Sequence, residues 1–249
     1  MGKCMRIVLL TNRDKSGLIK LILEEGFNMD AVIVPYNSNY EVALKPMMEF
    51  AQKCNLTILR IKHCDLEETL KDVNPDILLS AAYPFLLKPE HLRIAEYNIN
   101  IHPTLLPKYR GPATAWHIIA NGETETGVTV HAIDEGMDTG PIAVQEKVEL
   151  TMFDTLKTAM QKATALEPKA LRKELRRLKE GNLVFIPQDE ICASTYTGIR
   201  TQEDSKIDTH KSIMENYNFI RACDPERFPA FFELQGQKVG IKLFLIPEE

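Results

Sequence analysis

The chain has 249 residues, of which 44% are hydrophobic and 26% are charged, and its formal net charge is −5. This length suits one large domain, or one domain with a small appendage, of ordinary globular composition. The negative charge argues against a broad nucleic-acid-binding surface. No apolar run is as long as a membrane span and no signal peptide is recognisable, so we expect a cytoplasmic protein that is not anchored in a membrane.

Five cysteines are spread along the chain without a C-x-x-C pair; they are Cys4, Cys54, Cys64, Cys192 and Cys223. Their odd number and scattered spacing predict reduced thiols rather than a disulfide framework. No set of histidine, cysteine and acidic residues has the spacing of zinc ligands. We therefore expect no catalytic metal.

Short apolar runs alternate with helical patterns through the first third of the chain. The pattern predicts strands at 5–11, 29–35, 56–61 and 76–82, and helices at 16–25 and 41–54. A further short helix should begin with a capping box formed by Asp65 and Glu68. This alternation predicts a doubly wound, Rossmann-like α/β sheet whose strands are mostly parallel.

The turn after the first predicted strand, residues 12–17, reads NRDKSG and contains one glycine. A dinucleotide-binding fingerprint of the form G-x-G-x-x-G is therefore absent. This turn gives no sign of a glycine-rich phosphate loop.

Polar residues gather where strands are expected to stop, within residues 98–144. Asn100 and His102 end an apolar-alternating run two positions apart, so on a strand they would project to the same face. A β-rich run at 126–133 leads into a loop that carries Asp138, and a second such run starts near residue 142. Open α/β sheets bind ligands at the carboxyl ends of their strands, so we expect the functional site here.

This stretch resembles the folate-dependent formyltransferase family. The motifs that carry the resemblance are Asn-Ile-His-Pro-Thr-Leu-Leu-Pro at 100–107, Tyr-Arg-Gly at 109–111, Thr-Gly-Val-Thr at 126–129 and Asp-Thr-Gly at 138–140. Several motifs in the right order and spacing make the match specific. Thr104 stands where the family more often has serine, and both residues carry a hydroxyl. The resemblance covers roughly the first three quarters of the chain and weakens after residue 181.

The resemblance implies that Asn100, His102 and Asp138 are the catalytic residues. Formyl transfer to an amine is acyl transfer, so an oxyanion must be stabilised and a proton moved from the attacking to the leaving nitrogen. Asn100 would donate to the oxyanion, His102 would carry the proton, and Asp138 would orient the ring and favour the imidazolium. Such a set fits direct transfer without a covalent enzyme intermediate. We expect His131 to lie next to these residues without contacting the substrate.

The resemblance also implies N10-formyltetrahydrofolate as the formyl donor. Its pterin should lie between the loop after the fourth strand and the loop before Asp138, because a flat heterocycle needs apolar walls and a few placed polar groups. Taken alone, Tyr83 and Phe85 are equally well explained as core side chains. The expected folate-binding residues are Tyr83, Phe85, Leu86, Leu87, Ile133, Asp134 and Gly136.

The chain most resembles the sugar N-formyltransferases, which act on nucleotide-linked amino sugars for bacterial surface polysaccharides such as O-antigen. It lacks the glycine-rich phosphate loop of glycinamide ribonucleotide formyltransferases and the full C-terminal barrel of methionyl-tRNA formyltransferases. We expect Lys108, Arg110 and Arg200 to bind the diphosphate and Tyr196 to face the base. Surface charge explains Lys108 equally well. The expected substrate-binding residues are Lys108, Tyr109, Arg110, Gly111, Tyr196 and Arg200.

Residues 155–181 form a basic helical stretch interrupted at Pro168, which we interpret as a solvated face. We divide the chain into a catalytic domain at 1–181 and an appendage at 182–249, the latter made of a loop, a helix at 210–222 and a hairpin that turns at Gln235-Gly236. The apolar hairpin face should be covered by a second subunit in an isologous homodimer, or by its own domain. That face carries Val239, Ile241 and Leu243.

Two alternatives remain open at this point. One is a methionyl-tRNA formyltransferase relative with a truncated C-terminal domain, which the motif Ile220-Arg221-Ala222 resembles. Residues 191–249 carry seven lysines and arginines against nine acidic residues, a composition unfavourable for tRNA phosphates. The other is a folate-binding module without turnover, against which the intact Asn100, His102 and Asp138 argue. Hydrolysis of the formyl donor is a further possible activity.

Overall fold

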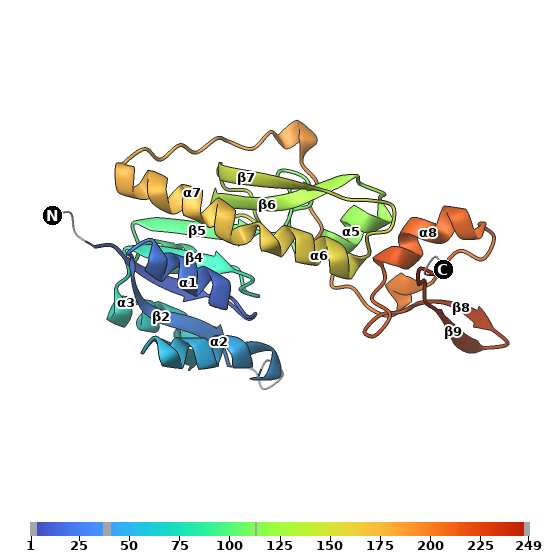
Figure 1. Cartoon of the computed structure of the whole chain (residues 1–249), viewed down its shortest axis with the longest axis horizontal. Helices are drawn as coiled ribbons and strands as arrows, with labels where there is room; N and C mark the ends of the chain where they lie inside the picture. Colours follow the sequence, from blue (N-terminus) through green and yellow to red (C-terminus); the bar gives the residue numbers. More distant parts are fainter. Residues whose placement is uncertain (1–3, 37–40, 113, 247–249) are drawn as a thin grey trace.

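The structure is a computed structural model that describes residues 4–36, 41–112 and 114–246. Seven strands form one sheet in the order β3-β2-β1-β4-β5-β6-β7 (Figure 1). The first five strands in sequence are parallel, and β6 and β7 are antiparallel to their neighbours. The strands are β1 Arg6–Leu10, β2 Asn28–Pro35, β3 Thr57–Ile61, β4 Ile77–Ala81, β5 Tyr97–His102, β6 Glu125–Ala132 and β7 Ile142–Glu149.

Alternate residues of the central strands enter two separate cores, because successive side chains of a strand point to opposite faces. Ile7 and Leu9 of β1 lie in the core beneath α1, α2 and α7, whereas Val8 and Leu10 lie in the core beneath α3 and α4. Burial on both faces explains why β1 is continuously apolar. The helices are α1 Ser16–Glu24, α2 Glu41–Lys53, α3 Leu66–Val73, α4 Pro89–Leu92, α5 Thr114–Ala120, α6 Leu156–Ala165, α7 Glu167–Glu180 and α8 Ile213–Ala222.

The structure confirms the predicted α/β fold class, and one local detail was wrong. Asp65 ends a 3-10 helix, η2 His63–Asp65, that runs directly into α3, and its side chain accepts no capping hydrogen bond. The capping box that we predicted with Glu68 is therefore not formed. The interruption near Pro168 is present, since α6 ends at Ala165 and this proline lies in the first turn of α7, where a missing N–H costs nothing.

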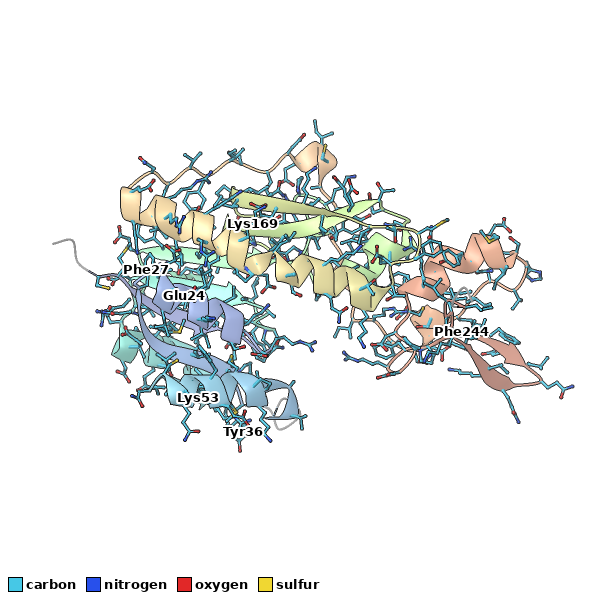
Figure 2. The ribbon with its side chains drawn as sticks, in the orientation of Figure 1. Glu24, Phe27, Tyr36, Lys53, Lys169 and Phe244 are labelled. Atoms are coloured by element: carbon cyan, nitrogen blue, oxygen red, sulfur yellow. The ribbon has the colours of Figure 1, made fainter. Side chains whose placement is uncertain are left out.

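The basic face of α7 is engaged by acidic side chains of the same chain. Arg172 Nε lies 3.0 Å and Arg176 Nη2 3.1 Å from Oε1 of Glu25, which follows α1. Lys169, labelled in Figure 2, lies 2.7 Å from Oε2 of Glu146 on β7. These pairs tie α7 to the sheet and to α1, so the basic face that we interpreted as solvated also forms ion pairs within the chain.

The appendage forms its own small core. Residues after α7 run back above β7 (Figure 1), and α8 is followed by the hairpin of β8 Ala230–Leu234 and β9 Gln237–Ile241. Gln235 and Gly236 both have positive φ, as a tight two-residue hairpin turn requires. Ile241 and Leu243 pack against buried residues of α8 and β8. A second subunit is therefore not needed to cover these two side chains, and the homodimer stays a prediction.

All five cysteines are free in the structure. Among the helices of the described ranges, none has the length and apolar character needed to cross a membrane.

Candidate active site

The carboxyl end of β5 places Asn100 and His102 on one face of the sheet. Asn100 pairs in register with Ser80 of β4 and with His131 of β6. The chain then leaves the sheet through a loop that contains the cis peptide bond Leu106-Pro107. Both side chains therefore lie between the central parallel strands and the antiparallel extension.

Asp138 comes to these residues from the loop between β6 and β7. Its Oδ2 accepts a 2.8 Å hydrogen bond from the Gly111 N–H and lies 3.5 Å from His102 Nδ1. Its Oδ1 accepts a 3.2 Å hydrogen bond from Asn100 Nδ2 and lies 3.5 Å from His131 Nε2. The three predicted catalytic side chains are thus brought together, with His131 as a fourth member of the group.

The His102 ring is held at both nitrogens. Nε2 lies 2.8 Å from the Tyr109 carbonyl oxygen, which only accepts, so Nε2 carries the proton and Nδ1 faces Asp138. Burial lowers the pKa of His102, opposed by the Asp138 carboxylate and the Tyr109 carbonyl. The ring is therefore neutral at neutral pH, with a basic nitrogen aimed at a carboxylate.

Asp138 is ionised in this setting. Burial acts to raise the pKa of its carboxyl, but the positive charge that His102 and His131 carry when protonated, together with the hydrogen bonds that His131 and the Gly111 N–H donate, lowers that pKa well below its ordinary range. The carboxylate can therefore stabilise an imidazolium that forms on His102.

Asn100 uses both amide protons in hydrogen bonds to neighbouring side chains. Nδ2 donates to Asp138 and lies 3.1 Å from His131 Nε2, while His131 Nδ1 lies 2.7 Å from the Ala132 carbonyl oxygen. That carbonyl only accepts, so Nδ1 of His131 carries the proton and Nε2 accepts from Asn100. An oxyanion bound by Asn100 would have to exchange with one of these two acceptors.

The predicted folate loop follows β4 directly and begins at Ala82, whose φ is +63°. Leu87 is buried and shares one apolar cluster with Tyr83 and Ile133, whereas Phe85 and Leu86 are 44% and 52% exposed. Burial raises the pKa of Tyr83 to about 12. The exposed pair is the part of the loop that is open to a ligand.

His63 supports this loop and was not singled out as a site residue from the sequence. Its ring stacks on Phe85 at a centroid distance of 4.6 Å, and its Nδ1 lies 3.2 Å from the Tyr83 hydroxyl. The opposite loop is held by Asp134, whose Oδ1 accepts from the Gly136 N–H and the Thr139 hydroxyl. Both predicted pterin-binding loops therefore have side chains that fix their shape.

Arg110, which we expected to bind a phosphate, pairs with residues of its own chain. Arg110 is only 3% exposed. Its guanidinium donates to Gln188 Oε1 from Nε and Nη2. It also donates to the Glu190 carboxylate from Nη1 and Nη2. Lys108 remains 57% exposed, with its ammonium 3.9 Å from Glu123. A buried guanidinium needs such partners, and a role of Arg110 in phosphate binding stays a prediction.

Tyr196 and Arg200 also make internal contacts that the sequence did not reveal. The Tyr196 ring stacks on His117 at 3.7 Å and lies parallel to Tyr109 at 5.8 Å. The Arg200 guanidinium lies 4.5 Å from the Trp116 ring centroid and donates to the Ser205 hydroxyl. These contacts join the appendage to α5 and occupy the groups that we had assigned to base and diphosphate.

A segment at residues 186–196, here called the strap, crosses both loops of the site. Ile186 pairs with Ile142 at the start of β7, and the Ser194 carbonyl accepts from the Arg110 N–H. The Ser194 hydroxyl accepts from the Tyr109 N–H at 2.8 Å. The strap begins just after the predicted domain boundary at 181, yet it packs on the catalytic body.

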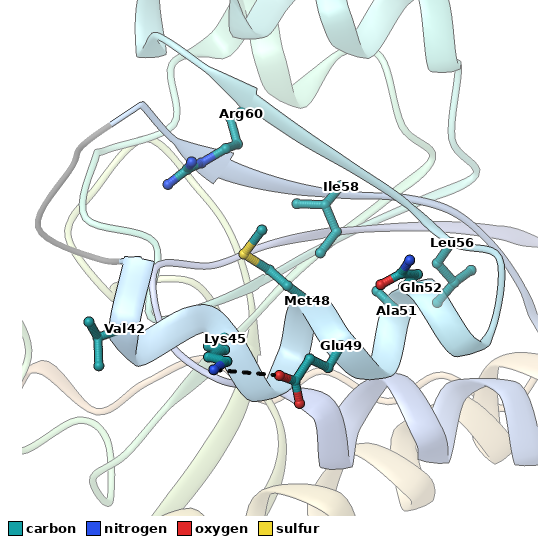
Figure 3. Close-up of a pocket in the computed structure, with 9 residues that line it drawn as sticks. All are labelled: Val42, Lys45, Met48, Glu49, Ala51, Gln52, Leu56, Ile58 and Arg60. Atoms are coloured by element: carbon teal, nitrogen blue, oxygen red, sulfur yellow. Dashed lines mark ion pairs between the residues drawn. The ribbon is translucent and has the colours of Figure 1, made fainter.

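A separate hollow of about 720 Å³ lies between α2 and β3 (Figure 3). Met48, Leu56 and Ile58 contribute to its lining, and the Lys45–Glu49 ion pair at 3.9 Å crosses its rim. Strands β2, β1 and β4 separate β3 from β5 in the sheet. This hollow is therefore remote from the catalytic group.

The formyl transferase family matches residues 34–175, which is more than half of the chain. The chain belongs to this family. A methionyl-tRNA formyltransferase of Kosmotoga olearia is 33% identical over 249 residues, covering 96% of this chain and 79% of the relative. One of Caldicellulosiruptor saccharolyticus is 34% identical, covering 94% and 78%. The protein is accordingly a formyl-transferring enzyme.

Solved structures that share the fold of this formyltransferase include two other formyltransferases. A 4-N formyltransferase from Francisella tularensis has a TM-score of 0.80 at 20% identity and covers 99% of this chain and 100% of that chain. An N-formyltransferase from Helicobacter canadensis, in complex with folinic acid and dTDP-3-aminofucose, has a TM-score of 0.75 at 23% identity and covers 94% and 86%. At these identities the likeness concerns the fold.

Proposed function

We propose that this formyltransferase transfers the formyl group of N10-formyltetrahydrofolate to the amine of a nucleotide-linked amino sugar. The observation that carries the chemistry is the buried group of Asn100, His102 and Asp138, in which the basic Nδ1 of His102 faces an ionised carboxylate. In the described part of the chain, Nδ1 of His102 lies beside this carboxylate and Nε2 donates to a carbonyl, so neither nitrogen contacts a hydroxyl or thiol to be activated.

Transfer then runs directly between the two nitrogens. The neutral amine attacks the formyl carbon, and the oxyanion that forms exchanges into the donor position of the Asn100 amide. Nδ1 of His102 takes a proton from the new ammonium, and Asp138 stabilises the resulting imidazolium. The bond from carbon to the folate nitrogen breaks, its electron pair stays on that nitrogen, and His102 returns the proton there. The products are a formamide and tetrahydrofolate.

The folate is assigned to the loops that carry Phe85 and Gly136. Phe85 and Leu86 offer exposed apolar surface beside β5, and the Asp134–Thr139 contact keeps the opposite loop compact. A pterin needs an apolar wall together with backbone polar groups, which these two loops would supply. The structure from Helicobacter canadensis that shares this fold contains folinic acid, a reduced folate.

A sugar acceptor is supported by the charges of the appendage. Lys206 pairs with Glu233 at 2.9 Å, and the Arg221 guanidinium is buried against the carbonyls of Thr151 and Asp154. Binding tRNA phosphates needs free cationic groups, which release counterions on binding. Basic side chains committed within the chain are poorly suited to that task.

The turn after β1 also disfavours a ribonucleotide. The Lys15 ammonium lies there 2.6 Å from Glu167 Oε2, and both side chains are buried. This ion pair closes the turn against α7, where a glycine-rich phosphate loop would need open backbone. We assign the diphosphate instead to the exposed Lys108, whose weak pair with Glu123 can exchange. The reaction would belong to the cytoplasmic synthesis of surface-polysaccharide sugars.

Methionyl-tRNA is the second candidate acceptor. The observation that favours it is the set of sequence relatives of that name, at 33% and 34% identity over most of this chain. It requires a basic surface and steep salt dependence of binding.

A thermal-shift panel of nucleotides and nucleotide-linked amino sugars, with a reduced folate present, tests the proposal. A ligand at a concentration 100 times its Kd stabilises the folded state by about 2.7 kcal/mol, a shift of several degrees in Tm. We expect a nucleotide-linked amino sugar to raise Tm, with Lys108→Ala reducing the shift. A panel without any stabilising nucleotide or sugar, together with stabilisation by initiator tRNA, would favour the second candidate.

A further inference from the structure

Gln188 of the strap contacts both loops that enclose His102. The first is the Asp138 loop, and the second is the Tyr109–Gly111 loop. Its Nε2 donates to the backbone carbonyls of Asp138 at 2.8 Å and Gly140 at 2.7 Å. Its Oε1 accepts from Arg110 Nε at 3.0 Å and Nη2 at 2.8 Å. One side-chain amide therefore satisfies two carbonyls of the first loop and one guanidinium of the second.

The two loops supply the two partners of the His102 ring. The first loop provides the Asp138 carboxylate on Nδ1, and the second provides the Tyr109 carbonyl on Nε2. The geometry of the general base therefore depends on the spacing between the loops. If the Asp138 carboxylate moves away by about an ångström, it stabilises the His102 imidazolium less than before.

Both loops are held in backbone conformations that need external support. Asp138 has φ +54° and Tyr109 has φ +61°, which lie in a backbone region that residues other than glycine rarely adopt. Such conformations persist where surrounding contacts determine them. The Asp138 carbonyl is fixed by Gln188, and the Tyr109 N–H is fixed by the Ser194 hydroxyl of the same strap.

We propose that Gln188 is a positioning residue for formyl transfer, which holds the Asp138 loop and the Tyr109–Gly111 loop at the spacing that aims Asp138 at His102. The inference rests on the proposed role of His102 and Asp138. Gln188 itself contacts backbone and Arg110, so it acts through these residues rather than on the substrate.

Gln188→Glu separates the two halves of this amide. The variant keeps an acceptor for Arg110 and loses both donors to the Asp138 loop. Gln202→Glu is the matched control, because Gln202 Nε2 also donates to a backbone carbonyl, that of Pro229 at 2.9 Å, within the appendage. Gln188→Met, which is uncharged and of similar length, provides a second variant in case the glutamate impairs folding.

We expect Gln188→Glu and Gln188→Met to lower kcat by roughly tenfold or more while KM changes by less than about threefold. The control should lose no more than about threefold in kcat, and thermal unfolding of each variant checks that it is folded. Retention of wild-type kcat, within about threefold, by a folded Gln188 variant would overturn the proposal.

Hydrogen exchange at the Gly111 amide gives a measurement that does not depend on which formyl acceptor the enzyme uses. This N–H donates to Asp138 Oδ2, so looser loops should speed its exchange by roughly tenfold in both Gln188 variants and leave it unchanged in Gln202→Glu. If the enzyme formylates none of the acceptors, the proposed function fails independently of this inference. The exchange rate then decides the positioning role of Gln188 by itself. Wild-type protection of Gly111 in the Gln188 variants would then contradict the positioning role.

Discussion

Nδ1 of His102 lies 3.5 Å from Oδ2 of Asp138, with side chains that are 8% and 16% exposed. His102→Asn and Asp138→Asn should therefore lower turnover by orders of magnitude without unfolding the protein. The first removes the base, and the second removes the charge that stabilises its protonated form. Steady-state kinetics with circular dichroism measures both effects. Near-normal turnover in either folded variant would exclude this pair as the catalytic base.

The pKa of His102 should lie below the ordinary pKa of histidine. Burial lowers the pKa of His102 from 6.5, so an NMR titration of the imidazole in the free enzyme should have its midpoint below 6.5. Asp138 favours the charged ring, so Asp138→Asn should move the NMR-detected pKa of His102 further down. An NMR midpoint above 6.5 in the wild type would contradict the lowered pKa of His102.

Gly111→Ala should damage both stability and activity. Gly111 has φ +99°, and an added Cβ would lie 2.1 Å from the Tyr196 carbonyl oxygen. Left-handed strain alone costs about 1–3 kcal/mol, and the clash moves the N–H that binds Asp138. Gly198→Ala is the matched control, because a Cβ there meets no atom within 4 Å. Urea unfolding and kcat compare the two; equal, small effects would show that the loop tolerates displacement.

Glu174→Leu should stabilise the protein. Glu174 is 0% exposed on α7, and its two carboxylate oxygens are buried without a hydrogen-bond partner among the described residues. An unsatisfied buried polar group costs about 1–3 kcal/mol, so its replacement should raise the free energy of unfolding by a similar amount. Glu180→Leu, at an exposed position of the same helix, is the control.

The gain from Glu174→Leu should grow with pH. Burial raises the pKa of Glu174 above 4.5, opposed by Arg177, so the folded state holds the proton more tightly than the unfolded state. The wild type therefore loses stability as pH rises from the unfolded pKa through the folded one. Urea unfolding at about pH 5 and about pH 8 measures this, and a gain that is larger at the lower pH would contradict it.

The sequence predicted the strands of the sheet because their patterns are local. Continuous apolar runs identify buried parallel strands such as β1, and the spacing of Asn100 and His102 places both on one strand face. The convergence of Asp138 with these residues followed from motif order and from the rule that sites lie at strand ends.

The roles of Arg110, Tyr196 and Arg200 depend on which residues fold against them. A lysine or arginine near a site has the same sequence signature whether it binds a phosphate or a partner in its own chain such as Glu190, 80 residues away. Gln188 gave no signal, because a single glutamine in a polar segment has no periodicity or motif. Its four hydrogen bonds exist only once the strap has crossed both loops.

A competition between acceptors tests the central claim most directly. The wild-type enzyme and His102→Asn would each receive N10-formyltetrahydrofolate with methionyl-tRNA or with a set of nucleotide-linked 3-amino and 4-amino deoxyhexoses, and mass spectrometry would locate the formyl group. We predict a formamide on the free amine of one sugar, absent with His102→Asn. Efficient formylation of methionyl-tRNA, with every sugar left unmodified, would contradict the proposed acceptor.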